Sequence, residues 1–167
     1  VPFMQQIGLP PLQAHFFVFY FAVFSTLTPP VAVSVLAAAK LSGASFVSTA
    51  LDSFKIALTT FIIPFAFVYF PELMTFPHLT WAVVPAIFVV VAIQWTLSIA
   101  SYGHLFRPLV GWERGVFAVA ALAGFMGMVY GDKTYYTAHA VLFIAMAMML
   151  FSTRNRNLKR AEVEAPE

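Results

Sequence analysis

The chain reads Ser25-Thr26-Leu27-Thr28-Pro29-Pro30 within a stretch, residues 1–39, that contains no Lys, Arg, Asp or Glu. Most of this stretch is apolar, and it is longer than the roughly 20 residues that a helix needs to cross a bilayer. Lipid offers no hydrogen bonds, so a membrane helix can be interrupted only where protein or a water-filled cavity satisfies the freed peptide groups. The hexapeptide therefore predicts a broken membrane helix.

The composition of the whole chain is that of a membrane protein. Hydrophobic residues make up 61% of the 167 residues and charged residues only 10%, whereas soluble domains average about 25% charged residues. The basic residues behind the net charge of +2 are spread through loops and one tail. Because there is no basic stripe, we do not expect nucleic acid as a partner. The expected partner is the lipid bilayer. The absence of cysteine excludes disulfides and thiolate metal sites.

Five apolar stretches predict an all-α integral membrane protein with five spans. The stretches are Leu12–Ala39, Phe54–Phe70, Trp81–Tyr102, Gly115–Tyr130 and Tyr135–Phe151. A crossing needs about 17 to 25 residues, so Gly115–Tyr130 is the weakest of the five. Pro64 and Pro85 predict kinks within their helices.

The positive charges predict the orientation of the chain. If all five stretches cross, eight of the nine Lys and Arg residues lie on one side, and only Lys133 lies on the other. The eight are Lys40, Lys55, Arg107, Arg114, Arg154, Arg156, Lys159 and Arg160. Cytoplasmic loops are enriched in such residues, so we expect a cytoplasmic C-terminus and Val1 outside.

The chain divides into three parts on this interpretation. Residues 1–74 hold the broken helix, a short helix at the cytoplasmic interface and a further membrane helix. Residues 75–152 form a three-helix membrane extension, and residues 153–167 form a charged cytoplasmic tail that is expected to be disordered. The interfacial helix is predicted from the helical spacing of apolar residues between 47 and 58. Because Val1 is not a Met, we expect a C-terminal piece of a longer protein; an unusual start codon is the alternative.

The break separates two expected half-helices, about Ala14–Thr26 and Pro29–Ala39. Thr28 is a favourable N-cap residue, and Pro29 suits the first helical position, where its missing N–H costs nothing. Pro30 prevents the first half from continuing, because a proline inside a helix loses a hydrogen bond and clashes with the preceding turn.

The break has the chemistry of an ion site. The hydroxyls of Ser25, Thr26 and Thr28 lie beside the carbonyls that end the first half-helix, and such oxygens suit Na⁺. The amide groups that begin the second half suit a carboxylate, and Ser34 could extend the polar face. The alternative is a proline kink whose hydroxyls bond back to local carbonyls. The residues alone leave both interpretations open.

The sequence around the break resembles a known family. The segments are Pro10-Pro11-Leu12-Gln13-Ala14-His15-Phe16-Phe17-Val18-Phe19-Tyr20, Thr28-Pro29-Pro30-Val31-Ala32, Ala37-Ala38-Ala39 and Gly43-Ala44. Together they resemble the large permease of tripartite ATP-independent periplasmic (TRAP) transporters, particularly the fused-permease type that works with a TAXI-class binding protein. The resemblance is strong over Ile7–Met74. Arg107-Pro108-Leu109 and Trp112-Glu113-Arg114 are similar to the extension of the fused forms.

The resemblance implies an elevator-type secondary transporter in a bacterial inner membrane. A periplasmic substrate-binding protein would deliver an organic anion such as a dicarboxylate, and Na⁺ moving inward would drive uptake without any cofactor. It further implies a sodium site that includes Thr26, Thr28, Pro29 and Pro30, with residues 1–74 as the C-terminal end of the transport core and Phe54–Phe70 as its last helix. The family's re-entrant hairpins, first repeat and small-subunit region are not among these residues. The remainder of the permease is therefore an expected partner, and we do not expect these residues to transport alone.

Other functions have weaker support in the sequence. No catalytic constellation is present, although an intramembrane enzyme using His15 and Ser25 is conceivable. A non-transporting membrane scaffold or assembly subunit is the second alternative. His15, His78, His104 and His139 lack metal-ligand spacing, while His15 and His139 lie inside spans, where ionisable groups can relay protons. The identity of the substrate and the choice between Na⁺ and H⁺ coupling stay open.

Overall fold

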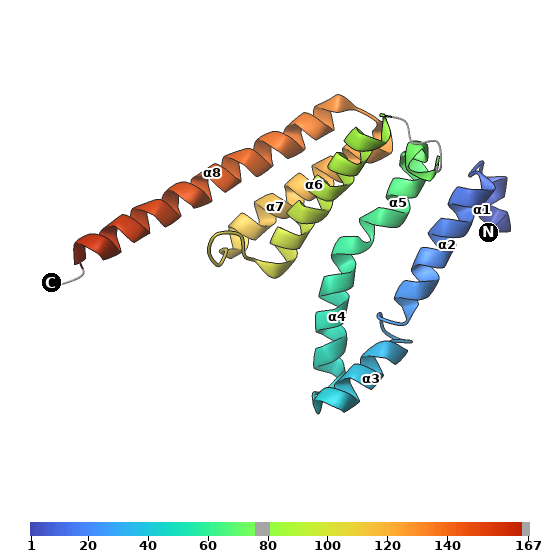
Figure 1. Ribbon diagram of the computed structural model, residues 1–167, viewed down its shortest axis with the longest axis horizontal. Helices are drawn as coiled ribbons and strands as arrows, with labels where there is room; N and C mark the ends of the chain where they lie inside the picture. The colour runs from blue at the N-terminus through green and yellow to red at the C-terminus, as the bar shows by residue number, and fades with distance from the viewer. Residues whose placement is uncertain (76–80, 165–167) are drawn as a thin grey trace. The chain divides into compact units, whose positions relative to one another are not determined.

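The structure, a computed structural model, describes residues 1–75 and 81–164; for Tyr135 and residues 152–164 it describes the backbone alone. The described residues are helical apart from the connections between helices (Figure 1). The elements are α1 (Pro2–Gln6), α2 (Pro11–Ser25), α3 (Val33–Ser42), α4 (Phe46–Thr60), α5 (Ile62–Tyr69), the 3₁₀ helix η1 (Pro71–Met74), α6 (Val83–Tyr102), α7 (Gly111–Tyr130) and α8 (Lys133–Glu164).

Three of the described helices are long and apolar enough to cross a bilayer. They are Phe46–Tyr69, which joins α4 and α5, Val83–Tyr102 and Gly111–Tyr130. The remaining apolar helices are shorter, namely Pro11–Ser25, Val33–Ser42 and Tyr136–Phe151. The prediction of an all-helical chain is confirmed for the described residues, and three of the five predicted spans have the length and composition of a full crossing.

The predicted interfacial helix is not a separate element. Its residues form α4, which begins at the N-cap Ser45, whose hydroxyl accepts the Ser48 N–H at 3.2 Å. With no glycine or proline between Phe46 and Phe61, nothing ends the helix early, and α5 continues it after the single residue Phe61. The prediction missed this because it placed the turn toward the membrane within a segment that has no helix-breaking residue.

Two further boundaries differ from the sequence prediction. Pro85 does not kink a helix, because it lies in the first turn of α6, where its missing N–H is not needed. The backbone of α8 continues as helix to Glu164, past residue 153, where the sequence predicts a disordered tail. Residues 153–164 contain neither glycine nor proline, so no residue there stops the helix.

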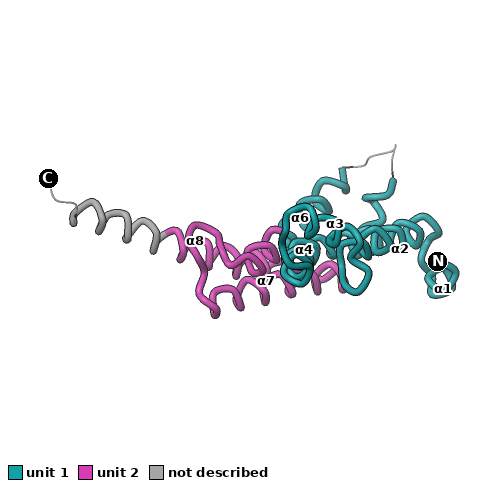
Figure 2. The backbone as a smooth tube through the Cα atoms, turned by 90° about the horizontal axis from the view of Figure 1, so that it is seen from below, with its two compact units in different colours: residues 1–94 teal, residues 95–167 magenta. Residues whose placement is uncertain are grey.

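The chain forms two compact units, Val1–Gln94 and Trp95–Glu167 (Figure 2). In the first unit, α2 packs against α5 and α3 packs against α4, so the two halves of the broken helix rest on one almost continuous partner. The contact between α3 and α4 is a small buried cluster of Ala32, Val35 and Ala50. The contact between α2 and α4–α5 is aromatic. Its ring pairs include Phe17–Phe65, Phe21–Phe61 and Phe24–Phe61, with centroids 5.4, 5.6 and 5.5 Å apart.

In the second unit, α7 and α8 pack against each other along small buried residues. The tight connection between them begins at Gly131, whose φ of 67° suits glycine. Asp132 then accepts the Thr134 N–H at 2.8 Å at the start of α8, and this hydrogen bond lowers the pKa of the Asp132 carboxyl. The core of the unit joins all three of its helices. It consists of Ile99, Ala100, Phe117, Met146 and Leu150.

The small cluster between α3 and α4 generates a first prediction. Ala50 is only 4% exposed, so Ala50→Leu should force α3 away from α4 and destabilise the protein by about 1–3 kcal/mol. Ala38, on the exposed side of α3, provides the matched control Ala38→Leu. Thermal unfolding of the full chain in detergent micelles measures both, and equal midpoints for the two variants would contradict the packing described.

Candidate functional site

The predicted break is present in the backbone between α2 and α3. The first helix ends at Ser25 and the second begins at Val33, with no helix from Thr26 to Ala32. The Pro29–Pro30 peptide bond within this segment is cis. Of the predicted site residues, Ser25 ends α2, Ser34 lies in the first turn of α3, and the other four lie in the break. All six are thus brought together in one local segment.

The predicted cap is wrong in its position. Thr28 does not cap the second half-helix, because the N-cap is Ala32 and no side chain bonds to the first turn. The reason is the second proline. Pro30 keeps Pro29 out of the helical region of backbone space, so the helix cannot start at Pro29.

Ala32 adopts a left-handed backbone conformation with a φ of 39° and is fully buried. A left-handed conformation costs a non-glycine residue roughly 1–2 kcal/mol. A larger side chain at this position would have to fit between α3 and α4, where Ala32 contacts Val35 and Ala50. Ala32 therefore has two roles: it packs between α3 and α4, and its left-handed backbone conformation sets the direction of the chain at the end of the break.

The three hydroxyls at the end of α2 donate to carbonyl oxygens of the preceding turn. Each donated hydrogen bond uses the hydroxyl proton and leaves the oxygen lone pairs free to accept a bond or to coordinate a cation. The pairs are Ser25 Oγ with Ala22 O at 2.6 Å, Thr26 Oγ1 with Val23 O at 2.8 Å and Thr28 Oγ1 with Phe24 O at 3.1 Å. These back-bonds are what a proline kink predicts, and they are equally compatible with a cation on the outward side of the hydroxyls.

Backbone hydrogen bonds span the break itself. The Ala32 N–H reaches the Thr28 carbonyl at 3.1 Å and the Ser25 carbonyl at 3.3 Å, and the Ser34 N–H reaches the Thr26 carbonyl at 3.1 Å. Other peptide oxygens of the break have no hydrogen-bond partner within residues 1–75 and 81–151. They are the carbonyls of Leu27, Pro29, Pro30 and Val31.

The break therefore exposes oxygen atoms without any compensating charge nearby in the sequence. Ser25, Thr26 and Thr28 are partly buried, whereas Pro29, Pro30 and Ser34 are exposed. The Ser34 hydroxyl has no hydrogen bond to the described residues. Neutral hydroxyl and carbonyl oxygens are ligands suited to a hard monovalent cation, and the carbonyl end of α2 adds a partial negative charge.

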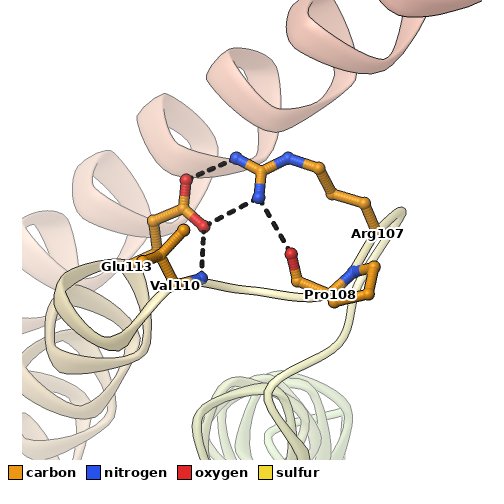
Figure 3. A network of polar contacts seen from close by, with 4 residues as sticks. All are labelled: Arg107, Pro108, Val110 and Glu113. Carbon is orange, nitrogen blue, oxygen red and sulfur yellow. Dashed lines mark hydrogen bonds and ion pairs between the residues drawn. The ribbon is translucent and has the colours of Figure 1, made fainter.

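A second polar cluster is fully paired (Figure 3). The Glu113 carboxylate, 1% exposed, receives two hydrogen bonds from the Arg107 guanidinium, one of them at 3.1 Å, and a third from the Val110 N–H at 2.9 Å. Arg107 also donates to the Pro108 carbonyl at 2.9 Å. This cluster caps the start of α7, which is why α7 begins at Gly111, before the apolar stretch predicted from Gly115.

Arg114 secures the other side of the same loop. Its Nε donates to the Ala100 carbonyl and a terminal nitrogen to the Ser101 carbonyl, both at 2.9 Å, so it satisfies the C-terminal end of α6. A side chain at Gly103 would meet Arg114 Cδ at 3.0 Å, and the φ of 66° at Gly103 also requires glycine. Both carboxylate oxygens of Glu113 have donors, so we interpret the second cluster as structural.

Two of the described histidines bond to backbone carbonyl oxygens. His15 Nδ1 lies 2.7 Å from the Pro11 carbonyl of its own helix, and buried His139 donates from Nδ1 to the Ala120 carbonyl at 2.7 Å, joining α8 to α7. His78 lies outside the described residues. Among the described residues there is no group of three or more His, Asp or Glu side chains that could hold a metal ion.

One polar contact of the first unit was not predicted from the sequence. The Tyr20 hydroxyl of α2 donates to the Thr60 carbonyl at the end of α4 at 3.1 Å. The available signal was Pro64, which has no N–H to offer the carbonyl four residues earlier. Nothing in the sequence indicates that the hydroxyl of Tyr20, forty residues before Thr60, replaces the missing N–H as the donor to the Thr60 carbonyl.

Residues 1–82 match the model of the family described as Tripartite ATP-independent periplasmic transporter, DctM component. The N-terminal part of the chain is a DctM domain. No curated protein and no solved structure matches the chain. The match covers the broken helix and α4–α5 and ends just before α6, so the DctM domain contains the candidate site.

The match relates residues 1–82 to the large permease component of TRAP transporters, which is a multi-pass membrane protein. The family is one of transporter permeases and not of enzymes, as the sequence predicted. The family has the generic partners of a TRAP system, a binding protein and a small membrane subunit.

The paired cluster at α7 generates the second prediction. Glu113→Gln keeps the shape of the side chain but removes its charge, and should cost about 1–3 kcal/mol of stability, since hydrogen bonds to charged groups are the strong ones. Asp52→Asn is the control, because Asp52 pairs with Lys55 at 3.3 Å with both side chains more than half exposed. Exposed pairs contribute about 0–1 kcal/mol. Unfolding midpoints of both variants in detergent measure the difference, and a larger loss for Asp52→Asn would refute the structural role of Glu113.

Proposed function

We propose that the chain is part of the membrane permease of a Na⁺-coupled, binding-protein-dependent secondary transporter that imports organic anions across a bacterial inner membrane. The observation that carries the proposal is the break between α2 and α3 inside a DctM domain. We assign the coupling-ion site to Ser25, Thr26, Thr28, Pro29, Pro30 and Ser34, with Thr26 and Thr28 as the proposed Na⁺ ligands.

The local chemistry supports a cation at the end of α2. Oxygen atoms are the ligands that suit Na⁺. The break offers hydroxyl lone pairs that the donated hydrogen bonds do not use, together with carbonyls that lack a partner among the described residues. In a bilayer an unsatisfied carbonyl costs several kcal/mol. A bound ion would recover this cost, which gives the unpaired oxygens a physical reason to persist.

The start of α3 supports an anion on the other side of the break. In its first turn the N–H groups of Val33 and Val35 have no hydrogen-bond partner among the described residues. Amide groups at a helix N-terminus favour a carboxylate. A cation at the end of α2 and a substrate carboxylate at the start of α3 would lie close together, which would account for coupling between ion binding and substrate binding.

The wider assignment follows the resemblance of the sequence to the fused-permease type. On this proposal the protein moves its site by an elevator motion, receives its substrate from a TAXI-type binding protein, and works only together with the remainder of the permease. Residues 83–167 lie outside the DctM match. This favours a second candidate role for α6–α8, that of a membrane scaffold or assembly element that does not itself transport.

The third prediction tests the ion site. In vesicles containing the permease that carries this chain and its binding protein, Thr28→Ala should raise the sodium half-saturation constant of uptake about tenfold, because contacts with a charged group are worth roughly 1.5–3 kcal/mol. Expression should fall much less. The control is Thr49→Ala, since the Thr49 hydroxyl makes the same kind of back-bond, to Ser45 at 3.0 Å, near the start of α4. An unchanged sodium half-saturation constant in Thr28→Ala would falsify the proposed ligand.

The fourth prediction tests the proposed orientation with five crossings. Reporter fusions after Arg107 and after Arg160 should both report the cytoplasm, because the positive charges are expected to stay on that side. A fusion after Lys133 should report the periplasm and serves as the internal control. A periplasmic signal at either of the first two positions contradicts the five-span topology.

A further inference from the structure

The α4–α5 helix has a break of its own, and α2 supplies the group that satisfies it. Pro64 has no N–H, so the carbonyl of Thr60, four residues earlier, loses its helical donor. The Tyr20 hydroxyl fills this place at 3.1 Å. Pro64 is almost completely buried and both Tyr20 and Thr60 are partly buried, so water is not a ready substitute for this hydrogen bond.

The ring of Tyr20 continues the contact toward the candidate ion site. It stacks on Phe24, one turn further along α2, with centroids 4.7 Å apart and planes within 9°. Phe24 in turn contacts Phe61, the residue between α4 and α5, with centroids 5.5 Å apart. The end of α2 is therefore fixed against the break in α4–α5 by the Tyr20 hydrogen bond and the Phe24–Phe61 ring contact, and the Tyr20–Phe24 stack joins these two contacts within α2.

The peptide group of Phe24 belongs to the candidate site. Its carbonyl accepts the hydrogen bond of the Thr28 hydroxyl at 3.1 Å and that of the Leu27 N–H at 3.0 Å. Phe24, Leu27 and Thr60 also line one open groove of about 240 Å³ against α4. The contacts thus run without a gap from the Thr60 carbonyl through Tyr20 and Phe24 to Thr28.

From this series of contacts we infer that Tyr20 is a positioning residue for the cation site at the helix break. It does not touch the ion. By holding the last turn of α2 on the Thr60 carbonyl, it fixes the direction in which the Thr28 hydroxyl oxygen and the Leu27 carbonyl point. The inference rests on the proposed function, because it concerns the geometry of the same site.

The test removes the hydroxyl alone. Tyr20→Phe should raise the sodium half-saturation constant of uptake about threefold, the size expected for one interhelical hydrogen bond in a membrane protein. The substrate KM at saturating sodium should stay within experimental error. Tyr69→Phe is the matched control, since the Tyr69 hydroxyl on α5 has no hydrogen bond to the described residues. Phe24→Leu, which removes the stacking but not the hydrogen bond, should shift the sodium constant in the same direction.

A double-mutant cycle tests the route through Thr60. Pro64→Ala restores an N–H at position 64 that can bond to the Thr60 carbonyl, so the Tyr20 hydroxyl becomes dispensable. The effect of Tyr20→Phe on the sodium constant should then largely disappear in the Pro64→Ala background. A purely structural role would change the amount of folded protein in all variants without this specific recovery.

The outcomes separate this inference from the proposed function. If Thr28→Ala raises the sodium constant but Tyr20→Phe does not, the positioning role is wrong and the ion site stands. If Tyr20→Phe acts equally in both backgrounds, the route through Thr60 is wrong. If uptake is independent of sodium in the unmodified permease, the proposed ion site fails and the positioning role fails with it.

Discussion

The helix break between Ser25 and Val33 depends on a nearly continuous partner, the α4–α5 helix. A membrane offers no water to an interrupted helix, so each peptide group at the break needs another partner or a ligand. Packing of α2 on α5 and of α3 on α4 keeps the two half-helices in place although no helical backbone joins them. The hydrogen bonds from Ala32 and Ser34 to carbonyls at and just beyond the end of α2 then close most of the gap. The carbonyl oxygens of the break that have no donor among the described residues are the ones that the proposed ion site uses.

The two interruptions in the first unit are physically linked. The break in α2–α3 is caused by Pro29 and Pro30, and the break in α4–α5 lies at Phe61, three residues before Pro64. The Tyr20 hydroxyl of α2 donates to the Thr60 carbonyl at the break in α4–α5. The ring of Phe24, also on α2, packs against Phe61 at the same break. Each interruption thus has its geometry fixed by the other helix. A structural change in one helix should therefore alter the geometry of the other.

The sequence predicts the parts of this fold that depend on local chemistry. Two adjacent prolines in an uncharged stretch are enough to predict the break, and the apolar stretches predict the helices. The position of the N-cap at Ala32 was missed, because the effect of Pro30 on Pro29 outweighs the capping preference of Thr28. The continuity of α4 and α5 was missed because a change of polarity along α4 was taken for a boundary. The Tyr20–Thr60 hydrogen bond joins residues forty positions apart, so only tertiary structure reveals it.

The two polar clusters of the described chain differ in a way that bears on function. At the start of α7 every oxygen of Glu113 has a donor, and the buried charge is neutralised by Arg107. Such a cluster has nothing left to offer a ligand, and its removal should affect stability alone. At the break after α2 there is no charged side chain, and several carbonyls have no donor among the described residues. An unpaired oxygen inside a membrane is costly, and this cost is the physical basis of the proposal that a ligand binds at the break. The lack of a fixed charge is compatible with the proposal that a coupling ion binds at the break and is released again.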